Sequence, residues 1–427
     1  MAPTASGSDP NPLPSVSGTG WARLNRRRLL LGGAAVGAIA TIPTLRRAGS
    51  PSRSGLAAQA TPGALDDDLR VSTAGWKTDF SKHSVSLSEI SSGGPGRDGI
   101  PPIDAPRYVP IADADGWLEA TEPVIAIIRE SIPGAGQARA YPLQIMVWHE
   151  IVNDELADAP LLVTFCPLCN TAIAFDRRLS PDPGGPVYDF GTTGNLRGSD
   201  LVMWDRQTES WWQQLTGEAI VGELTGRRLT PVPAQILGWS AFKTAYPTGD
   251  VLSRDTGHGR DYGANPYVGY DDVDQPPFLF DGDLDGRLPP MERVVALTIG
   301  DEAAAYPFAA LAASRAVNDR VGGQDVAILY APGARSALDT SAIADGRDVG
   351  QAGVFARALD DRLLTFRPEG DDQFADAETG TTWDVTGTAL AGPLAGRRLT
   401  PLPHTIAFWF AWAAFQPTTR VWTPPGS

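Results

Sequence analysis

The chain has 427 residues, of which 42% are apolar, and this composition indicates a globular protein of two or three domains. Its formal net charge of −15 at neutral pH makes a surface that repels phosphate backbones, which excludes nucleic acid as an expected partner. Outside the N-terminus, no segment is long and apolar enough to span a bilayer.

The N-terminus resembles a twin-arginine export signal. The string NRRRLLLGGAAVGAIATI joins an arginine cluster at 26–28 to a mild apolar run that is short for a membrane span. The triplet AQA at 58–60 offers a cleavage site, while two arginines at 46–47 leave open an uncleaved membrane tether. A disordered basic tail is the alternative. We therefore expect the body to act outside the cytoplasm, in the periplasm or at the cell surface, where neighbouring thiols can oxidise.

Several strings of the body recur in the same order. GRRLTPVPAQILGWSAF, from Gly226, returns as GRRLTPLPHTIAFWFAW from Gly396, and AYP and VND each return 165 residues downstream. This recurrence indicates two copies of one unit, each large enough for its own core. The predicted domains are a signal and disordered leader (1–60), a linker and N-terminal extension (61–122), copy one with the cysteines (123–253), a loop-rich connector (254–292) and copy two (293–427).

Within copy one the pattern predicts a strand, a short helix and then many strands. PVIAII is an extended stretch, and LQIMVWHEIVND then places Leu143, Val147 and Ile151 on one helical face. LLVTF at 161–165 is typical of a buried strand, and IAF, VYDF, LVMW and AIVGEL follow between Gly, Pro and Asp turns. GWSAFKTAYP predicts a closing helix that ends at Pro247. The expected fold class is α+β with strands dominant, and both a barrel and a sandwich stay open.

The motif TFCPLCNTAIAF, at 164–175, holds both cysteines of the chain. A thioredoxin-type dithiol needs a long helix after the motif, whereas the alternation of Ile173 and Phe175 before a Pro/Gly turn favours a strand. A structural zinc site would need a second ligand pair, which the sequence lacks. Two interpretations stay open. One is a structural disulfide closing a very small loop; the other is a redox or soft-metal site at Cys166 and Cys169, completed by a thioether or imidazole and suited to Cu(I).

Met203 and His149 are the candidate third ligands. Each has an ordinary structural explanation, since a strand methionine usually packs in a core and a half-buried histidine is usually hydrogen-bonded. Copy two replaces TFCPLCNTA by LYAPGARSA, so alanines at 331 and 334 stand in place of the cysteines and Ser314 in place of His149. The framework thus recurs without the ligands. We expect one working site in copy one beside a degenerate, supporting copy two.

The turn DRQTESWWQQ is a candidate ligand pocket. An aromatic wall with charged and amide groups would be formed by Asp205, Arg206, Trp211, Trp212 and Gln213. Its counterpart DAETGTTWD keeps the Asp, a Thr and a Trp, and this pattern equally fits a turn capped by Asp and Thr over a core tryptophan.

The acidic run DGDLDGRLPPME matches the calcium-loop pattern in full. Asp281, Asp283 and Asp285 would supply oxygens, and Glu292 would supply the carboxylate of the twelfth position. The internal prolines and the preceding PPFLF exclude the two flanking helices of an EF-hand. A calcium-stapled connector and an acidic, solvated turn are therefore the alternatives.

Four segments together resemble the family known as domain of unknown function 3179. They are AYPLQIMVWHEIVND, TFCPLCNTAIAFDR, the stretch from GNLRGSDLVMWDRQTESWWQQ to GRRLTPVP, and RDYGANPYVGYDD, and the resemblance runs from about residue 100 to 425. It implies a bacterial or archaeal protein that is exported or membrane-tethered, with the paired cysteines as a hallmark and no established activity. The calcium-like run is not part of the family's pattern.

Two functions of different class follow from these observations. The leading hypothesis is an exported protein whose cysteine pair binds a soft metal, copper before any other, or cycles as a redox dithiol. The rival is a non-catalytic ligand-binding or scaffold module with an inert disulfide. Whether the chain is an enzyme stays open. A third donor beside the sulfurs would favour the metal site, and buried sulfurs without one would favour the rival.

Overall fold

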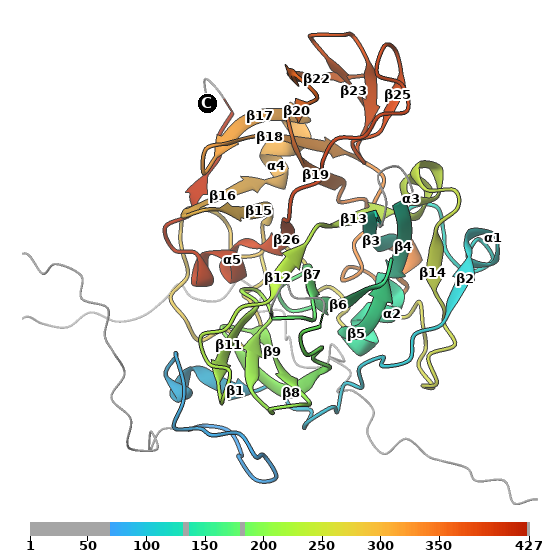
Figure 1. Ribbon diagram of the computed structural model, residues 1–427. Helices are drawn as coiled ribbons and strands as arrows, with labels where there is room; N and C mark the ends of the chain where they lie inside the picture. Colours follow the sequence, from blue (N-terminus) through green and yellow to red (C-terminus); the bar gives the residue numbers. More distant parts are fainter. Residues whose placement is uncertain (1–68, 131–135, 180–183, 425–427) are drawn as a thin grey trace, which may run out of the picture.

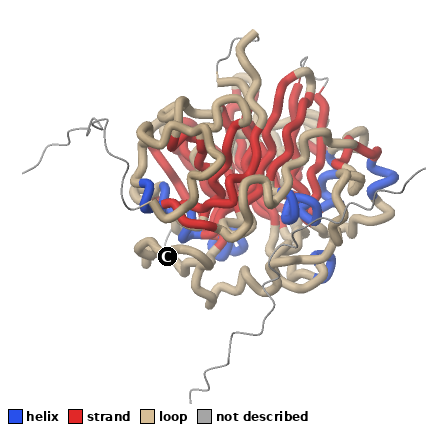
Figure 2. The backbone as a smooth tube through the Cα atoms, turned by 90° about the horizontal axis from the view of Figure 1, so that it is seen from below, coloured by secondary structure: helices blue, strands red, loops and turns tan. Residues whose placement is uncertain are grey.

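The structure is a computed structural model, and it describes residues 69–424 except 131–135 and 180–183. The predicted export signal and tether lie outside these residues. Figure 1 shows two strand-rich halves, and Figure 2 shows the strands in the middle of the molecule with short helices and loops around them. The prediction of an α+β fold dominated by strands is confirmed, and none of the sheets in the described part of the chain closes into a barrel.

The first half, residues 123–252, contains three sheets that also recruit two strands from the N-terminal extension. In order of pairing, one sheet is β13 (Ala234–Gly238), β3 (Pro123–Glu130), β4 (Gly136–Pro142), β14 (Asp250–Leu252) and β2 (Tyr108–Pro110). The second is β12 (Thr230–Val232), β7 (Thr171–Asp176), β6 (Ala159–Cys166) and β5 (Ile151–Leu156). The third is β1 (Ile90–Ser92), β8 (Phe190–Arg197), β9 (Asp200–Asp205), β10 (Trp211–Gln213) and β11 (Glu218–Val221).

The second half, residues 293–421, also has three main sheets and one short hairpin. The first is β26 (Thr405–Phe408), β15 (Arg293–Ile299), β16 (Glu302–Pro307) and β27 (Arg420–Val421). The second is β17 (Ala316–Val321), β18 (Gln324–Ala331) and β19 (Gln351–Ala356), and the third is β22 (Phe366–Glu369), β23 (Gln373–Asp376), β24 (Thr382–Asp384) and β25 (Ala389–Ala391). The hairpin is β20 (Ala358–Leu359) with β21 (Arg362–Leu363).

The helices are short. They are α1 (Ile111–Ala114), α2 (Leu143–His149), α3 (Trp239–Ala245), α4 (Phe308–Ser314) and α5 (Trp409–Phe415), with 3₁₀ turns η1 (Leu87–Glu89) and η2 (Ile343–Asp345). The closing helix predicted to end at Pro247 is α3. No helix in the described residues is long and apolar enough to cross a membrane.

The corresponding sheets of the two halves have the same strand order. β13-β3-β4-β14 corresponds to β26-β15-β16-β27, β7-β6-β5 to β19-β18-β17, and β8-β9-β10-β11 to β22-β23-β24-β25. In both halves the last strand pairs in parallel with the second, β14 with β4 and β27 with β16. This order follows the two copies seen in the sequence, while the proposed domain boundaries and the descent of both halves from one unit stay predictions.

The helix predicted to run past His149 ends there instead. Glu150 has a φ of 59°, in the left-handed region, and its N–H caps the last turn by donating to Met146 O. Ile151, placed on the helical face by its spacing, begins β5 and pairs with Thr164 of β6. That part of the prediction was wrong because a strand partner thirteen residues along the chain supplies the hydrogen bonds that a longer helix would have made.

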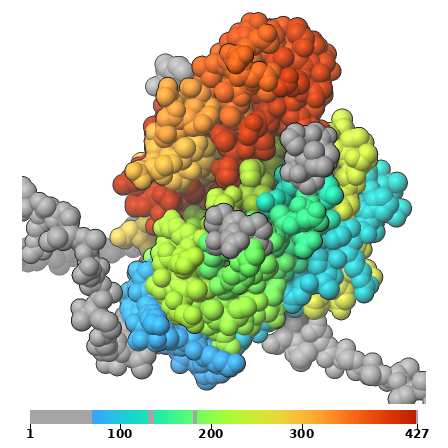
Figure 3. Space-filling view, in the orientation of Figure 1, coloured from blue at the N-terminus to red at the C-terminus, as the bar shows by residue number. Residues whose placement is uncertain are grey.

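The two halves contact each other at two corresponding turns, the one between β6 and β7 and the one between β18 and β19. The N–H of Phe408, at the end of β26, donates to the carbonyl of Cys169 at 2.9 Å, and the N–H of Gly238, at the end of β13, donates to Gln351 Oε1 at 3.0 Å. A side chain at Gly238 would put its Cβ 1.9 Å from the carbonyl oxygen of Gly333. The cysteine turn and its counterpart in the second half thus each abut the other half. Figure 3 shows the broad contact between the halves.

The N-terminal extension completes the first half. β1 pairs with β8, and an isolated bridge joins His83 to Val221 of β11. Trp76 and Phe80 pack edge-on against Trp211, each with ring centroids 5.1 Å apart. In Figure 3 this segment, in blue, lies against the green surface of the first half. The extension therefore buries β9 and β10 on the face opposite the cysteine turn's core cluster.

Candidate metal centre

Both cysteines lie at the turn between β6 and β7. Cys166 is the last residue of β6 and pairs with Thr171, the first of β7, and Cys169 lies in the turn between them. β6 is buried at nearly every position, as expected for the continuous apolar run that precedes the motif. Asn170 closes the turn with a φ of 53°. Both cysteines are free thiols, and their side chains are buried.

A tight hairpin brings a carboxylate to the two sulfurs. β8 and β9 are joined by Gly198 and Ser199, whose φ angles of 57° and 64° fit a two-residue hairpin loop with both residues left-handed. The Ser199 carbonyl lies 3.4 Å from Cys169 Sγ and 3.9 Å from Cys166 Sγ. Asp200, the next residue, is completely buried.

The ligand atoms of Cys166, Cys169 and Asp200 all lie within 4.8 Å of one another. In the described part of the chain this is the one cluster of three or more His, Cys, Asp or Glu side chains that could hold a metal ion. Asp200 Oδ2 accepts hydrogen bonds from Gln213 Nε2 at 2.6 Å and from Leu215 N at 2.9 Å. Asp200 Oδ1 is buried and has no hydrogen-bond partner. A cation beside the sulfurs would satisfy this orphaned oxygen.

The side chains of the centre are weak acids whose pKa values are all raised. Burial raises the pKa of the Cys166 thiol and raises that of Cys169 well above its usual range. Burial also raises the pKa of Asp200 to about 6, and burial together with the charge of Asp200 raises that of Glu150 to about 8. No basic side chain is among the main groups that shift these four pKa values. Four potential anions therefore share one buried region, and burial is the largest cause of each raised pKa.

A small cavity of about 80 Å³ opens onto the centre. Glu150 and Cys166 both border it, and the connector covers it with Tyr267, Phe278 and Leu279. The connector is fastened over the cysteine turn by hydrogen bonds, because Tyr270 donates its hydroxyl to Leu168 O at 2.9 Å and Ser199 Oγ donates to Phe278 O at 2.6 Å. Cys166 is thus the sulfur nearer to an approaching ion or reagent.

The two predicted third ligands, His149 and Met203, have different surroundings in the structure. Both ring nitrogens of His149 are hydrogen-bonded, Nδ1 to Pro101 O at 2.7 Å and Nε2 to the Tyr262 hydroxyl at 2.6 Å. Burial lowers the pKa of this imidazole to about 4, so it is neutral at physiological pH. Met203 is fully buried in the same apolar cluster as both cysteines. His149 does not belong to the three-ligand group, which Asp200 completes, while the role of Met203 as a ligand stays a prediction.

Two of the predicted pocket residues form a turn that recurs in both halves. Asp205 Oδ2 accepts from Trp212 Nε1 at 2.9 Å, and Asp205 Oδ1 accepts from Thr208 N at 2.6 Å. In the second half Asp376 accepts from Trp383 Nε1, also at 2.9 Å. These contacts fit the second interpretation of DRQTESWWQQ, in which an aspartate caps a turn over a core tryptophan, rather than a ligand pocket.

The other three predicted pocket residues have separate partners. Trp211 is fully buried beneath the N-terminal extension, and Arg206 forms an ion pair of 2.9 Å with Asp104. Gln213 reaches the centre itself, because its amide donates to Asp200. It therefore orients the carboxylate rather than lining a pocket.

The acidic run of the connector does not gather around one point. Asp281 pairs with Arg70 at 3.1 Å, and the Asp285 carboxylate holds the Arg287 guanidinium. Glu292 Oε1 accepts from Ala309 N at 3.0 Å, and Asp283 is exposed. These carboxylates are engaged by arginines and a helix N–H, so the contacts are those of an acidic turn rather than of a calcium loop.

Sequence reasoning missed Asp200, Glu150 and Ser199. Asp200 ends the string RGSD, which has the form of a solvated hairpin turn, and Glu150 falls inside a helical periodicity. The counterpart of Glu150 is Arg315, whose φ is 62°. The left-handed backbone therefore belongs to the fold, and the buried carboxyl is specific to the first half. The available signal was the exchange of this acid for an arginine at the matching position of copy two.

Glu150 makes the stability of the metal-free protein depend on pH. Its folded-state pKa of about 8 exceeds the ordinary 4.5, so the folded state holds the proton more tightly than the unfolded chain. This contribution is fully present below pH 4.5 and is lost as the pH rises to 8, a change of about 5 kcal/mol. We expect Glu150→Gln to match the wild type at pH 4.5 and to be more stable above pH 8 in denaturant unfolding. The exposed Glu155→Gln on β5 is the control, and a pH-independent difference for Glu150→Gln would contradict the assignment.

Comparison with known proteins identifies the family of the chain. The family described as "Protein of unknown function (DUF3179)" matches residues 97–419. The chain belongs to this family. No curated protein and no solved structure matches it. The family match covers both halves, the connector and the cysteine turn, and it leaves the chemistry of the centre to be inferred from the geometry.

Proposed function

We propose that this protein binds one soft or borderline metal ion at the sulfurs of Cys166 and Cys169, beside Asp200, outside the cytoplasm. The observation that carries the proposal is the convergence of three buried acidic donors within 4.8 Å, one of them with a carboxylate oxygen that has no hydrogen-bond partner. Burying one ionised acid without a counter-charge is costly, and a bound cation would offset that cost for all three. The proton of each thiol would be released when the ion binds.

The thiol pair favours Cu(I), which prefers thiolate ligands. Two thiolates around Cu(I), with Asp200 protonated, leave one net negative charge in the centre. A divalent ion such as Zn²⁺, held by both thiolates and the Asp200 carboxylate, leaves the same charge and suits a mixed sulfur and oxygen set. Participation of Asp200 therefore distinguishes the two ions, and we assign Cu(I) on the strength of the sulfurs.

Reconstitution tests this assignment. Reduced, metal-free protein is loaded with Cu(I) or Zn²⁺ without oxygen, desalted and analysed for metal per chain. We expect one copper per chain in the wild type and in Asp200→Asn, whose neutral amide resembles the protonated acid. Zinc binding, where it occurs, is expected to be lost in Asp200→Asn. A wild-type chain that retains neither ion would contradict the proposal.

A redox dithiol is the second candidate, and one observation favours it: Cys166 borders the cavity while its partner thiol lies behind it. Its raised thiol pKa counts against it, because the attacking species is the thiolate, and reactive cysteines lie in electropositive surroundings. The scaffold module with an inert disulfide requires a bridge between sulfurs that are free in this structure. A disulfide that resists reduction in the purified protein would favour that rival.

A further inference from the structure

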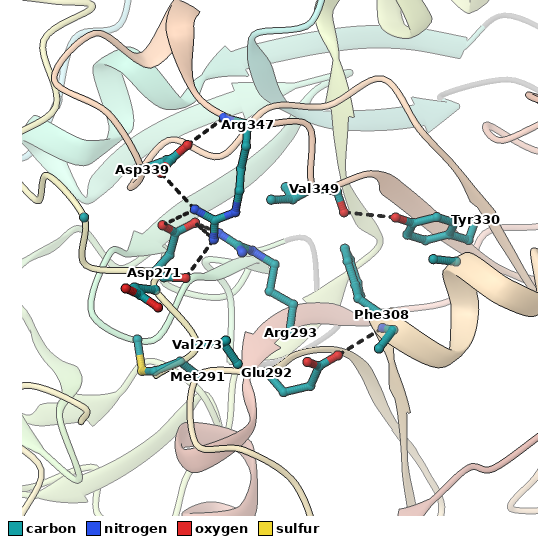
Figure 4. Close-up of a pocket in the computed structure, with 14 residues that line it drawn as sticks. Asp271, Val273, Met291, Glu292, Arg293, Phe308, Tyr330, Asp339, Arg347 and Val349 are labelled. Carbon is teal, nitrogen blue, oxygen red and sulfur yellow. Dashed lines mark hydrogen bonds and ion pairs between the residues drawn. The ribbon is translucent and has the colours of Figure 1, made fainter. Parts of the chain in front are cut away.

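A second, larger cavity lies in the second half, apart from the cysteines. Its volume is about 520 Å³, which falls within the range of small-molecule sites. Figure 4 shows its lining, which comes from the connector, from the start of β15 and from α4. Tyr330, which also lines it, directly precedes Ala331, the residue that stands in place of Cys166. The half that lacks the cysteines therefore holds a cavity of its own.

One wall is a buried cluster of ion pairs. Asp271 is completely buried and pairs with Arg293 at 2.5 Å and with Arg347 at 2.8 Å. Ser336 donates to the same carboxylate, and Arg347 also pairs with Asp339 at 2.9 Å. Figure 4 shows the two guanidinium groups meeting over Asp271. Both carboxylate oxygens of Asp271 therefore already accept hydrogen bonds.

Some N–H groups of the Arg293 guanidinium donate to no acceptor within the described residues. Its side chain is only 9% exposed, and its hydrogen bonds to Asp271 and Ser336 both come from Nη2. Nε and Nη1 make no hydrogen bond within the described residues. Arg293 also borders the cavity. A buried guanidinium with free N–H groups is a site for a ligand carboxylate, which it can bind through charge-assisted hydrogen bonds.

The cavity also presents a free anion and apolar surface. Glu292 Oε1 accepts from Ala309 N, and Glu292 Oε2 makes no hydrogen bond to any residue that the structure describes. Phe308 and Val349 supply apolar lining between the charged groups and α4, as Figure 4 shows. A ligand that carried only a negative charge would be repelled by Glu292. A ligand that carried only a positive charge would leave the donors of Arg293 unsatisfied.

We propose that this cavity binds a small zwitterion, an α-amino acid with an apolar side chain. The carboxylate lies on the free N–H groups of Arg293, the ammonium group on Glu292, and the side chain against Phe308 and Val349. This binding requires no metal and does not depend on the cysteine centre. The second half is then a ligand-binding unit in its own right rather than only a support for the first.

Isothermal titration calorimetry with metal-free protein tests the proposal. The probe is L-phenylalanine, and the two matched half-ligands are 3-phenylpropanoate, which lacks the ammonium group, and 2-phenylethylamine, which lacks the carboxylate. We expect saturable binding of phenylalanine and binding of each half-ligand weaker by about tenfold or more, since each loses one charge-assisted contact. Equal binding of a half-ligand, or no binding of phenylalanine at millimolar concentration, would overturn the proposal.

Two neighbouring alanines of α4 provide variants that spare the buried ion pairs. Ala312 borders the cavity and Ala313 does not, and both are exposed. We expect Ala312→Phe to fill the cavity and abolish measurable phenylalanine binding, while Ala313→Phe retains it. Thermal melting of both variants checks that they are folded. Unchanged binding in a folded Ala312→Phe protein would place the ligand elsewhere and refute the site.

Discussion

Replacing Cys169 with serine is expected to weaken Cu(I) binding by more than about a hundredfold, because even the loss of a second-shell partner costs 10–100-fold. Serine keeps the size of the side chain but offers a hard hydroxyl that stays protonated, so the ion loses one of its two soft ligands. Cys166→Ser is expected to behave in the same way. The measurement is competition with a chromophoric Cu(I) chelator under anaerobic conditions.

Met203→Leu is the matched control for these variants. It removes the thioether sulfur of the predicted third ligand, which lies in the same apolar cluster as both cysteines, and leucine keeps the side chain apolar. Wild-type affinity in Met203→Leu, together with the loss in both serine variants, would locate binding at the cysteine pair. A Cys169→Ser protein that retains full affinity would rule the pair out as the binding site.

Replacing either buried hairpin tryptophan with alanine is expected to cost about 3–5 kcal/mol of unfolding free energy. Trp212 and Trp383 are both completely buried, and each donates its indole N–H to an aspartate that caps the turn. Alanine would leave a large cavity and remove one of the two hydrogen bonds that the aspartate Oδ2 accepts in each half. Equilibrium denaturation measures the loss.

The two tryptophan variants also separate structure from binding. Trp383 lies in the second half, far along the chain from the cysteines, so a folded Trp383→Ala protein is expected to keep its copper. Phenylalanine at either position keeps most of the volume and is expected to recover part of the stability. A loss below about 1 kcal/mol for both alanine variants would contradict the role of these residues as core anchors.

The strands of this fold were largely predictable because their signals are local. LLVTF and IAF became the buried neighbours β6 and β7, and LVMW became part of β9. The string VYDF was a poorer prediction, since β8 begins only at Phe190. The strand order could not be predicted, because it depends on pairings such as β14 beside β4 that join residues more than a hundred positions apart.

The cysteines could be found from sequence, whereas their third partner could not. Asp200 is the last residue of a turn string that is normally solvated, but in the structure it is buried beside the cysteine turn, and the connector is fastened over this region through Ser199 and Tyr270. Burial of that carboxylate is thus a long-range property. His149 was a reasonable candidate by its position, but Pro101 and Tyr262 occupy its ring nitrogens, and both lie far from it in the chain.

X-ray absorption spectroscopy at the metal edge of the copper-loaded protein tests the central claim most directly. The account predicts a single copper site whose nearest neighbours are two sulfur atoms. The sulfur signal is expected to fall to one in Cys166→Ser and to persist in Met203→Leu. A copper coordinated only by nitrogen and oxygen, or a sulfur signal that disappears with Met203 rather than with the cysteines, would contradict it.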